Sequence, residues 1–185
     1  MTVVIEALGP GRFDGYRFAG KNSLQAAFEA ALKVQDDPVA LEAAWTRCLA
    51  IAPDNAAVWS NRGTARLALK MWKEAAEDLQ KARELEAQAY GYASGFVLVA
   101  LGNAKGALGR WEEAIECYEA ALEDPYPGIS ALALASSSLA KFELKKDGDA
   151  VATAQQALVE APEFGVCPPV PSPPLPHLTT TREVE

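Results

Sequence analysis

The chain has 185 residues, half of them apolar, and a formal net charge of −8 at pH 7. This length suits one domain or a repeat array with tails. The negative charge excludes proteins that bind nucleic-acid phosphates or anionic lipids through a basic face. Ala, Leu and Glu are the most frequent residues and strand formers are scarce after residue 10, so we expect an all-α protein.

The cysteines and the hydropathy of the chain indicate the cellular compartment in which the protein works. Cys48, Cys117 and Cys167 lie far apart and form no CxxC pair, which predicts reduced thiols and an intracellular, reducing compartment. The apolar run 96–101 is much shorter than the roughly 20 residues that span a bilayer, so we expect no transmembrane segment. The N-terminus has no basic flank or cleavage site of a secretory signal, and an earlier transit peptide is left open.

Residues 1–21 form an N-terminal arm that differs in composition from the rest of the chain. Phe13, Tyr16 and Phe18 are separated only by Asp, Gly and Arg. An arm of this length has no core of its own. We therefore expect its aromatic side chains to pack on the rest of the chain or on a partner.

The arm also contains GYRFAGK, residues 15–21, which nearly matches the GxxxxGK of a phosphate-binding loop. Asn22 stands where that loop places a Ser or Thr hydroxyl for Mg²⁺, and no buried strand leads into it. Nucleotide binding is therefore a remote alternative. In the simpler interpretation, Gly20 ends the arm and Asn22 or Ser23 caps the first helix.

A pattern of small and apolar residues repeats along the next part of the chain. In the second of its units the recurring residues are Trp59, Gly63, Ala75, Leu79 and Ala82. The pattern returns 39 residues later, as Gly63 and Gly102 show, and again 36 residues later, as Ala114 and Ala150 show. It predicts four helix pairs, over about residues 22–55, 56–89, 95–128 and 131–164. The turn of the first pair is expected at 36–38, and five extra residues are expected near 90–94, between units.

This pattern resembles the tetratricopeptide repeat family, whose 34-residue units read W-x2-LG-x2-Y, then A-x3-F, then A and P. The resemblance covers about residues 22–164. In the first and last units Glu29 and Ser138 replace the glycine at the helix contact. The resemblance implies a right-handed α-solenoid of about four antiparallel helix pairs.

The same resemblance implies a concave groove that is lined by first helices and binds a peptide or a helix. Mapped onto this chain, the groove residues are Asn61, Thr64, Leu67, Phe96, Val99, Asn103, Leu132, Ala135 and Leu139. Some members clamp the acidic tail of a heat-shock chaperone with Lys, Arg and Asn, but only the two Asn positions match here. A small, apolar groove suits an amphipathic helix or an extended apolar segment. Cover by the chain's own arm or tail is left open.

Residues 165–185 form a proline-rich tail, and seven prolines lie between Pro162 and Pro176. Such a segment favours the extended polyproline II conformation. We expect Phe164, Val166 and Leu175 to cover the end of the last helix pair or a neighbouring subunit, because the ends of repeat arrays need a cover. A ligand for an aromatic groove is the alternative.

Catalytic chemistry has little support in the sequence. His177 is the single histidine, and only Cys167 lies near it in the tail. Metal sites need three or four clustered ligands, and no such cluster is evident. We therefore expect no enzyme activity, no metal and no cofactor.

We interpret the chain as a non-catalytic protein–protein interaction scaffold, a peripheral or linker subunit that stabilises a larger multi-subunit complex. The stretches WSNRGTARLAL and LGNAKGALGRWEEAIECYEAAL resemble repeat proteins of chloroplasts and cyanobacteria. That resemblance implies a plastid complex, such as a photosynthetic one on the stromal side of the thylakoid. The alternative is a transient co-chaperone or assembly factor that binds an apolar peptide or helix.

Overall fold

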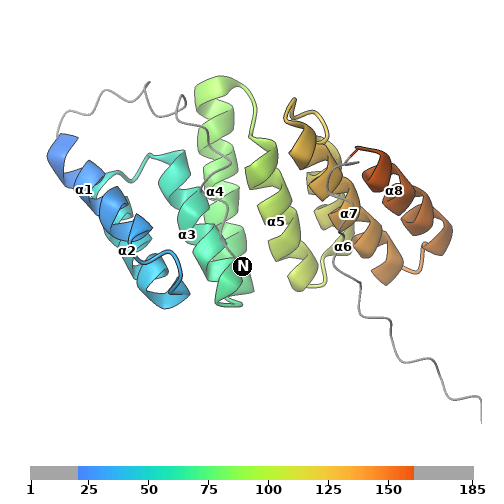
Figure 1. Cartoon of the computed structure of the whole chain (residues 1–185), viewed down its shortest axis with the longest axis horizontal. Coiled ribbons are helices and arrows are strands. Elements are labelled where there is room, and N and C mark those ends of the chain that lie inside the picture. The colour runs from blue at the N-terminus through green and yellow to red at the C-terminus, as the bar shows by residue number, and fades with distance from the viewer. Residues whose placement is uncertain (1–20, 161–185) are drawn as a thin grey trace, which may run out of the picture.

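A computed structural model describes residues 21–160, which form eight α-helices in a row of four antiparallel pairs (Figure 1). The helices are α1 (Lys21–Leu32), α2 (Pro38–Ile51), α3 (Ala56–Ala68), α4 (Trp72–Tyr90), α5 (Gly95–Ala107), α6 (Trp111–Ala121), α7 (Pro127–Glu143) and α8 (Asp147–Glu160). Each helix packs on the next one along the chain, and α5 also contacts α3 and α7. The predicted all-α solenoid of four helix pairs is confirmed.

The first turn of α1 differs from the sequence-based expectation. Because α1 begins at Lys21, Asn22 and Ser23 lie inside the helix and do not occupy its cap position. The turn after α1 agrees with the expectation. Asp37 Oδ1 accepts hydrogen bonds from the backbone N–H groups of Val39 and Ala40, at 3.0 and 3.1 Å. Pro38 begins α2 and costs it no hydrogen bond, because the first N–H of a helix has no partner within the helix.

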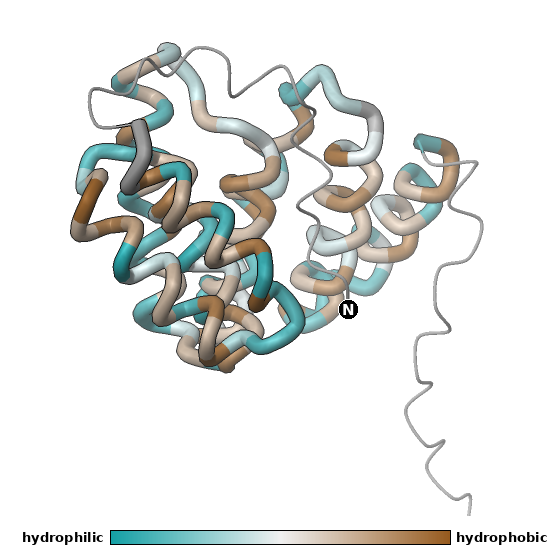
Figure 2. The backbone as a smooth tube through the Cα atoms, turned by 60° about the vertical axis from the view of Figure 1, so that its left-hand side comes forward, coloured by the Kyte–Doolittle hydropathy of each residue, from teal (hydrophilic) through white to brown (hydrophobic). Residues whose placement is uncertain are grey.

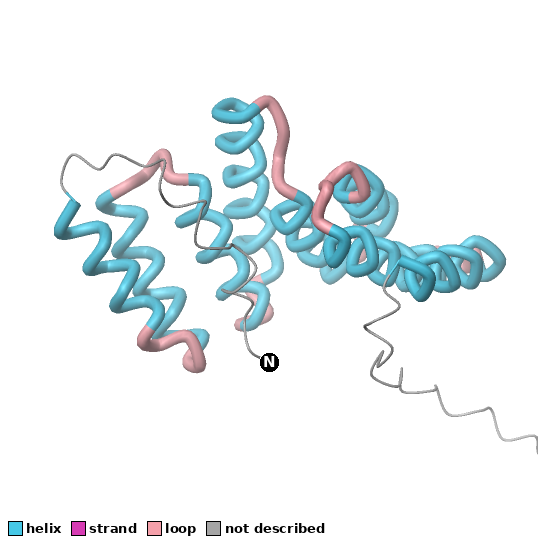
Figure 3. Tube along the Cα trace, turned by 45° about the horizontal axis from the view of Figure 1, so that its top comes forward, coloured by secondary structure: helices cyan, strands magenta, loops and turns pink. Residues whose placement is uncertain are grey.

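The extra residues of the second unit partly lengthen a helix. α4 has 19 residues and projects past its neighbours (Figures 1 and 3). No helix breaker interrupts residues 83–90, so the helix continues until Gly91, whose φ of 82° ends it in the left-handed conformation. Only residues 91–94 therefore form the loop before α5. α7 is also longer than expected, but at its start. It begins at Pro127, four residues before position 131, where the unit was expected to start.

Two carboxylates hold the N-terminus of α5. Glu86 of α4 accepts hydrogen bonds from the N–H and the hydroxyl of Ser94, at 2.7 and 2.9 Å for Oε2. Asp124 accepts from the N–H of Gly95 at 2.7 Å and from the N–H of Tyr126 at 2.9 Å. The first N–H groups of a helix lack helical partners and favour negative charge. These contacts therefore fix α5 against α4 and against the start of α7.

Hydrophobic residues recur on every helix, with hydrophilic residues between them (Figure 2). They form a core along the row because glycines let paired helices approach closely. A Cβ atom on Gly63 would lie 2.7 Å from Cγ of Leu79, and one on Gly102 would overlap the ring of Tyr118. Among residues 21–160, no helix is both long enough and apolar enough to cross a membrane.

Candidate partner-binding groove

The first helices of the last three pairs present equivalent positions to one surface. α3 begins at Ala56 and α5 at Gly95, a step of 39 residues, whereas α5 ends at Ala107 and α7 at Glu143, a step of 36. These steps align Thr64 with Asn103 and Leu139, and Phe96 with Leu132, whereas the equivalent of Asn61 in α5 is the buried Ala100. We use "the groove" for the predicted surface that comprises Asn61, Thr64, Phe96, Asn103, Leu132 and Leu139.

The α3 and α5 side of the groove is polar but uncharged. Asn61 is half-buried, and the hydroxyl of Thr64 donates to its own helix, to the carbonyl of Ser60 at 2.9 Å. Asn103 is exposed, and its Oδ1 accepts a hydrogen bond of 2.9 Å from the hydroxyl of Tyr118. Burial raises the pKa of Tyr118, so this hydroxyl remains a donor. Among residues 21–160 the amide N–H groups of Asn103 have no acceptor, so they can bind one on a partner.

The α7 side of the groove is apolar. Leu132 and Leu139 are seven residues apart, two helical turns, and both are exposed. Phe96 of α5 is half-buried and packs against the core cluster that α5, α6 and α7 share. Large apolar side chains on one helix face without a cover are typical of a surface that binds another protein.

Three predicted groove residues lie elsewhere. Val99 is only 3% exposed and packs in the cluster with Ile129 and Ala133 of α7, so a partner in the groove cannot reach it. Leu67 is half-buried against the cluster of α4 and α5. Ala135 is exposed, but it aligns with Val99 and not with the groove positions. These side chains point along the row toward the next helix pair, which a mapping from a single unit does not show.

The structure also holds a charge network that the sequence analysis missed. Asp78 of α4 is buried and accepts from Arg62 through both its oxygens, at 2.7 and 2.8 Å. Arg66 binds Asp78 at 2.9 Å and Glu42 of α2 at 2.9 Å. Arg62 also lies 5.0 Å from the centroid of the Trp59 ring. The network joins the first two helix pairs, and its place in the interior indicates a structural role.

A signal for this network was present in the sequence. Arg62 and Arg66 stand where the repeat pattern has Leu and Tyr, which are positions inside the helix pair. A charged residue at a buried position needs an opposite charge. Two such arginines in one helix therefore predict a buried acidic partner nearby.

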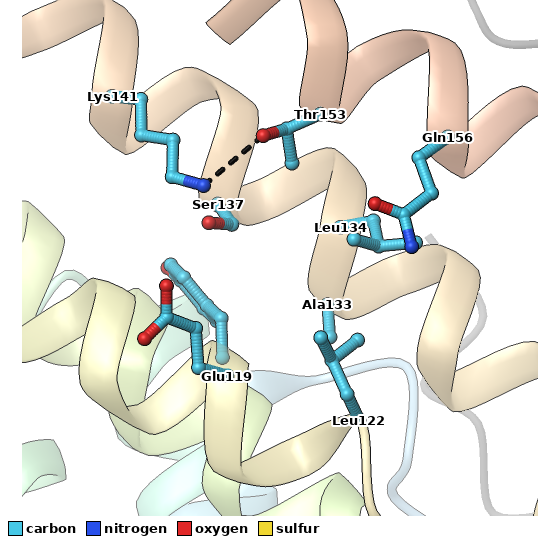
Figure 4. A pocket seen from close by; sticks show the side chains of 9 residues that line it. Glu119, Leu122, Ala133, Leu134, Ser137, Lys141, Thr153 and Gln156 are labelled. Carbon is cyan, nitrogen blue, oxygen red and sulfur yellow. Dashed lines mark hydrogen bonds between the residues drawn. The ribbon is translucent and has the colours of Figure 1, made fainter. Parts of the chain in front are cut away.

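A cavity of about 190 Å³ lies between α6, α7 and α8 (Figure 4). Within it the ammonium group of Lys141 donates to the hydroxyl of Thr153 at 3.0 Å. Ser137 stands 36 residues after Leu101, so a small residue occupies the position that Leu fills in α5. The cavity lies between helices and not in the groove. It therefore reflects looser packing of the last pair.

Replacing Ser137 with alanine is expected to stabilise the protein by about 1 kcal/mol. Its Oγ is buried and, among the described residues, has no hydrogen-bond partner, and such a group costs roughly 1–3 kcal/mol. Urea unfolding of wild type and Ser137→Ala measures the difference. Thr153→Ala is the matched control, because its hydroxyl is bonded to Lys141 and to the carbonyl of Asp149, and its loss is expected to destabilise.

The described part of the chain gives no sign of redox or metal chemistry. Cys48 and Cys117 are buried, free thiols, and both lie in hydrophobic core clusters. Burial raises the pKa of both thiols and keeps them protonated and unreactive. Within residues 21–160, no three His, Cys, Asp or Glu side chains gather as metal ligands would.

The remaining predicted contacts lie outside the described residues. They are the arm residues Phe13, Tyr16 and Phe18, the tail residues Phe164, Val166 and Leu175, the loop-like stretch 15–20, Cys167 and His177.

Residues 54–124 match the family model described as tetratricopeptide repeat. These residues cover α3 to α6, the two pairs that carry the repeat pattern most fully. The resemblance proposed from the sequence is therefore confirmed for the centre of the chain. No curated protein matches the chain at a significant level.

Solved structures share the fold at low sequence identity. One, described as "Crystal structure of MamA", is 20% identical and has a TM-score of 0.66. The match covers 78% of this chain and 81% of that one. A second, "Crystal structure of MamA protein", is 20% identical with a TM-score of 0.65, covering 84% of this chain and 82% of that one. A third, "MamA MSR-1 C2", is 19% identical with a TM-score of 0.64, covering 80% and 82%. This likeness shows the fold alone.

Proposed function

We propose that this chain, whose residues 54–124 are tetratricopeptide repeats, is a non-catalytic scaffold that holds an apolar segment of another protein in its groove. Proteins with these repeats bind other proteins, and the fold is generally not catalytic. The observation that carries the proposal is the pair Leu132 and Leu139. Both are exposed on the groove side of α7, where a soluble protein would otherwise place polar residues.

The groove chemistry favours an amphipathic helix or an extended apolar segment as its ligand. The six groove residues carry no charge, so a strongly charged ligand would lose its hydration without gaining a partner. Leu132 and Leu139 offer apolar contacts spaced two turns apart, which suits anchors at i and i+7 of a bound helix. The free amide N–H groups of Asn103 would fix the ligand by binding one of its carbonyl groups.

The same chemistry argues against the carboxylate clamp. A clamp needs Lys and Arg beside Asn, but the positions three and four residues from Asn61 and Asn103 on their helices hold Ala, Val, Thr or Gly. A co-chaperone that grips an acidic tail is therefore disfavoured. An assembly factor that binds an apolar segment for a limited time remains the second candidate.

We further propose that the chain is a permanent subunit of a larger complex. A permanent subunit co-purifies with its partner at a fixed ratio, whereas an assembly factor does not. Placement of the complex in a plastid stays a prediction from the wording of the central repeats. Cross-linking mass spectrometry of the native complex tests both proposals, because it identifies what contacts the groove and at what stoichiometry.

Leu139→Glu is expected to weaken partner binding by about tenfold to a hundredfold, because a central apolar contact is replaced by a charge that the interface would bury. Stability should change by no more than about 0.5 kcal/mol, because the side chain is exposed. Affinity for the cross-linked partner and thermal unfolding measure the two effects. Val159→Glu is the matched control, since Val159 is an exposed aliphatic residue of α8 away from the groove. Full binding by Leu139→Glu would contradict the proposal.

A further inference from the structure

The last helix pair exposes residues whose equivalents are covered in the pairs before it. The step of 36 residues aligns Val99 with Ala135 and Gly106 with Phe142. Val99 is 3% exposed because α7 packs against this side of α5, whereas Gly106 is buried against Trp111 and Ala114 of α6. Ala135 is exposed and Phe142 is 56% exposed. No helix follows α8 among the described residues to cover them.

The second helix of the last pair shows the same difference. Ile115 of α6 is half-buried against the shared core, but its equivalent in α8, Val151, is 59% exposed. Leu122, just after α6, is 37% exposed, and its equivalent Leu158 is 62% exposed. We use "end face" for the surface formed by Ala135, Val151 and Leu158. It is the side on which a fifth helix pair would stack.

The end face is also poor in charge. Residues 150–159 of α8 contain no Asp, Glu, Lys or Arg. The corresponding residues 114–123 carry Glu116, Glu119 and Glu123. Arrays of this kind require a polar or covered outer face on the terminal repeat for solubility. An uncharged, exposed, apolar end face therefore needs a cover.

We propose that the chain's own tail, residues 164–176, covers the end face. The tail leaves α8 directly at Glu160, so it starts at the edge of this surface. Phe164 follows four residues later, which at roughly 3.3 Å per residue gives a reach of about 13 Å, enough to return to Leu158. In polyproline II form, residues 168–176 span about 28 Å at roughly 3.1 Å per residue. The 14 residues of α8 span about 21 Å, so the segment is long enough to cross the end face from one end of α8 to the other.

The chemistry of the tail suits a helical surface. The side of a helix offers no free backbone donors or acceptors, because its backbone groups bond within the helix. A segment that packs there leaves its own N–H groups unpaired, but proline has none. Residues 164–181 also contain no Asp, Glu, Lys or Arg. The tail therefore buries Phe164, Val166 and Leu175 on the end face with few unpaired polar groups.

A second copy of the chain is the competing occupant. Each copy has a net charge of −8, so two copies repel one another at low salt. The tail needs no second molecule, because its attachment to α8 gives it a local concentration in the range of about 1 mM or more. These two effects favour the tail.

The test places a photoreactive amino acid, p-benzoylphenylalanine, at Val151 or at Ala152 in the full-length chain. The two residues are at nearly the same chain distance from the tail and are both exposed, but they point about 100° apart around α8. Mass spectrometry then counts cross-links to residues 161–185. The expected yield from position 151 is about ten times that from 152, the ratio given by docking of about 1.4 kcal/mol. Circular dichroism confirms that each variant keeps its helices.

The contrary outcomes are distinct. Equal yields from positions 151 and 152 would show an unattached tail and overturn the proposal. Covalent dimers from position 151 would show that a second copy occupies the end face, and would overturn it too. In the supporting case, Phe164→Ser combined with Val166→Ser should reduce the yield at 151 to that at 152. The cross-links of the groove are unaffected in each case, so this test is separate from that of the proposed function.

Discussion

Asp78→Ala is expected to lower the free energy of unfolding by about 3–5 kcal/mol, the cost of leaving buried charges unpaired. The Asp78 side chain is 3% exposed and accepts hydrogen bonds from Arg62 and Arg66. Both guanidinium groups are largely buried between α3 and α4. Without the carboxylate, Arg62 keeps no anionic partner among the described residues, and Arg66 keeps only Glu42.

Denaturant unfolding of wild type and variant measures this loss. Glu113→Ala is the matched control, because Glu113 also pairs with an arginine, Arg110, but on the surface. Exposed ion pairs contribute little, so its effect should be small by comparison. The triple variant R62L/R66Y/D78L is expected to recover most of the stability, because well-packed apolar residues can replace a buried ion network. Equal losses in Asp78→Ala and Glu113→Ala would contradict the structural role of the network.

Gly102→Ala is expected to destabilise the protein by about 1–3 kcal/mol, the usual cost of overpacking a core. The added Cβ would overlap the ring of Tyr118, which is buried in the cluster of α5, α6 and α7. The ring cannot move freely, because its hydroxyl is bonded to Asn103. The substitution should therefore also displace Asn103 and weaken partner binding.

Thermal and urea unfolding measure the effect on stability. Gly148→Ala is the matched control, because a Cβ there meets no atom within 4 Å. Alanine stabilises a helix relative to glycine by roughly 0.5–1 kcal/mol, so the two variants are expected to shift stability in opposite directions. A stabilising Gly102→Ala would show that the α5–α6 contact is looser than the structure indicates.

Much of the fold follows from residue spacing. Gly63 and Gly102 recur where helices approach closely, and this pattern predicted the helix pairs, because only a missing side chain permits the contact with Leu79 or Tyr118. The turn at Asp37 was predictable for a similarly local reason. Carboxylate capping followed by proline depends only on neighbours in the chain.

The groove was only partly predictable, because burial depends on the next helix pair. Asn103 and Leu139 are exposed, as residues of a groove must be, but Val99 is covered by α7. Spacing within one helix gives the direction of a side chain and not what packs against it. The network of Asp78 was missed for the same reason, since its partners come from another helix. Both the burial of Val99 and the pairing of Asp78 depend on which helices are neighbours in space, and a single sequence does not state this.

The two hydrogen bonds of Asp124 have a mechanical consequence. This one carboxylate binds the N–H groups of Gly95 and Tyr126, at the start of α5 and just before the start of α7. Phe96 and Leu132, two residues of the groove, stand one and six residues beyond these two points. Asp124 therefore ties together the starts of the two helices that carry them. The distance between these two side chains, and with it the width of the segment that fits between them, is expected to change when the Asp124 carboxylate is removed.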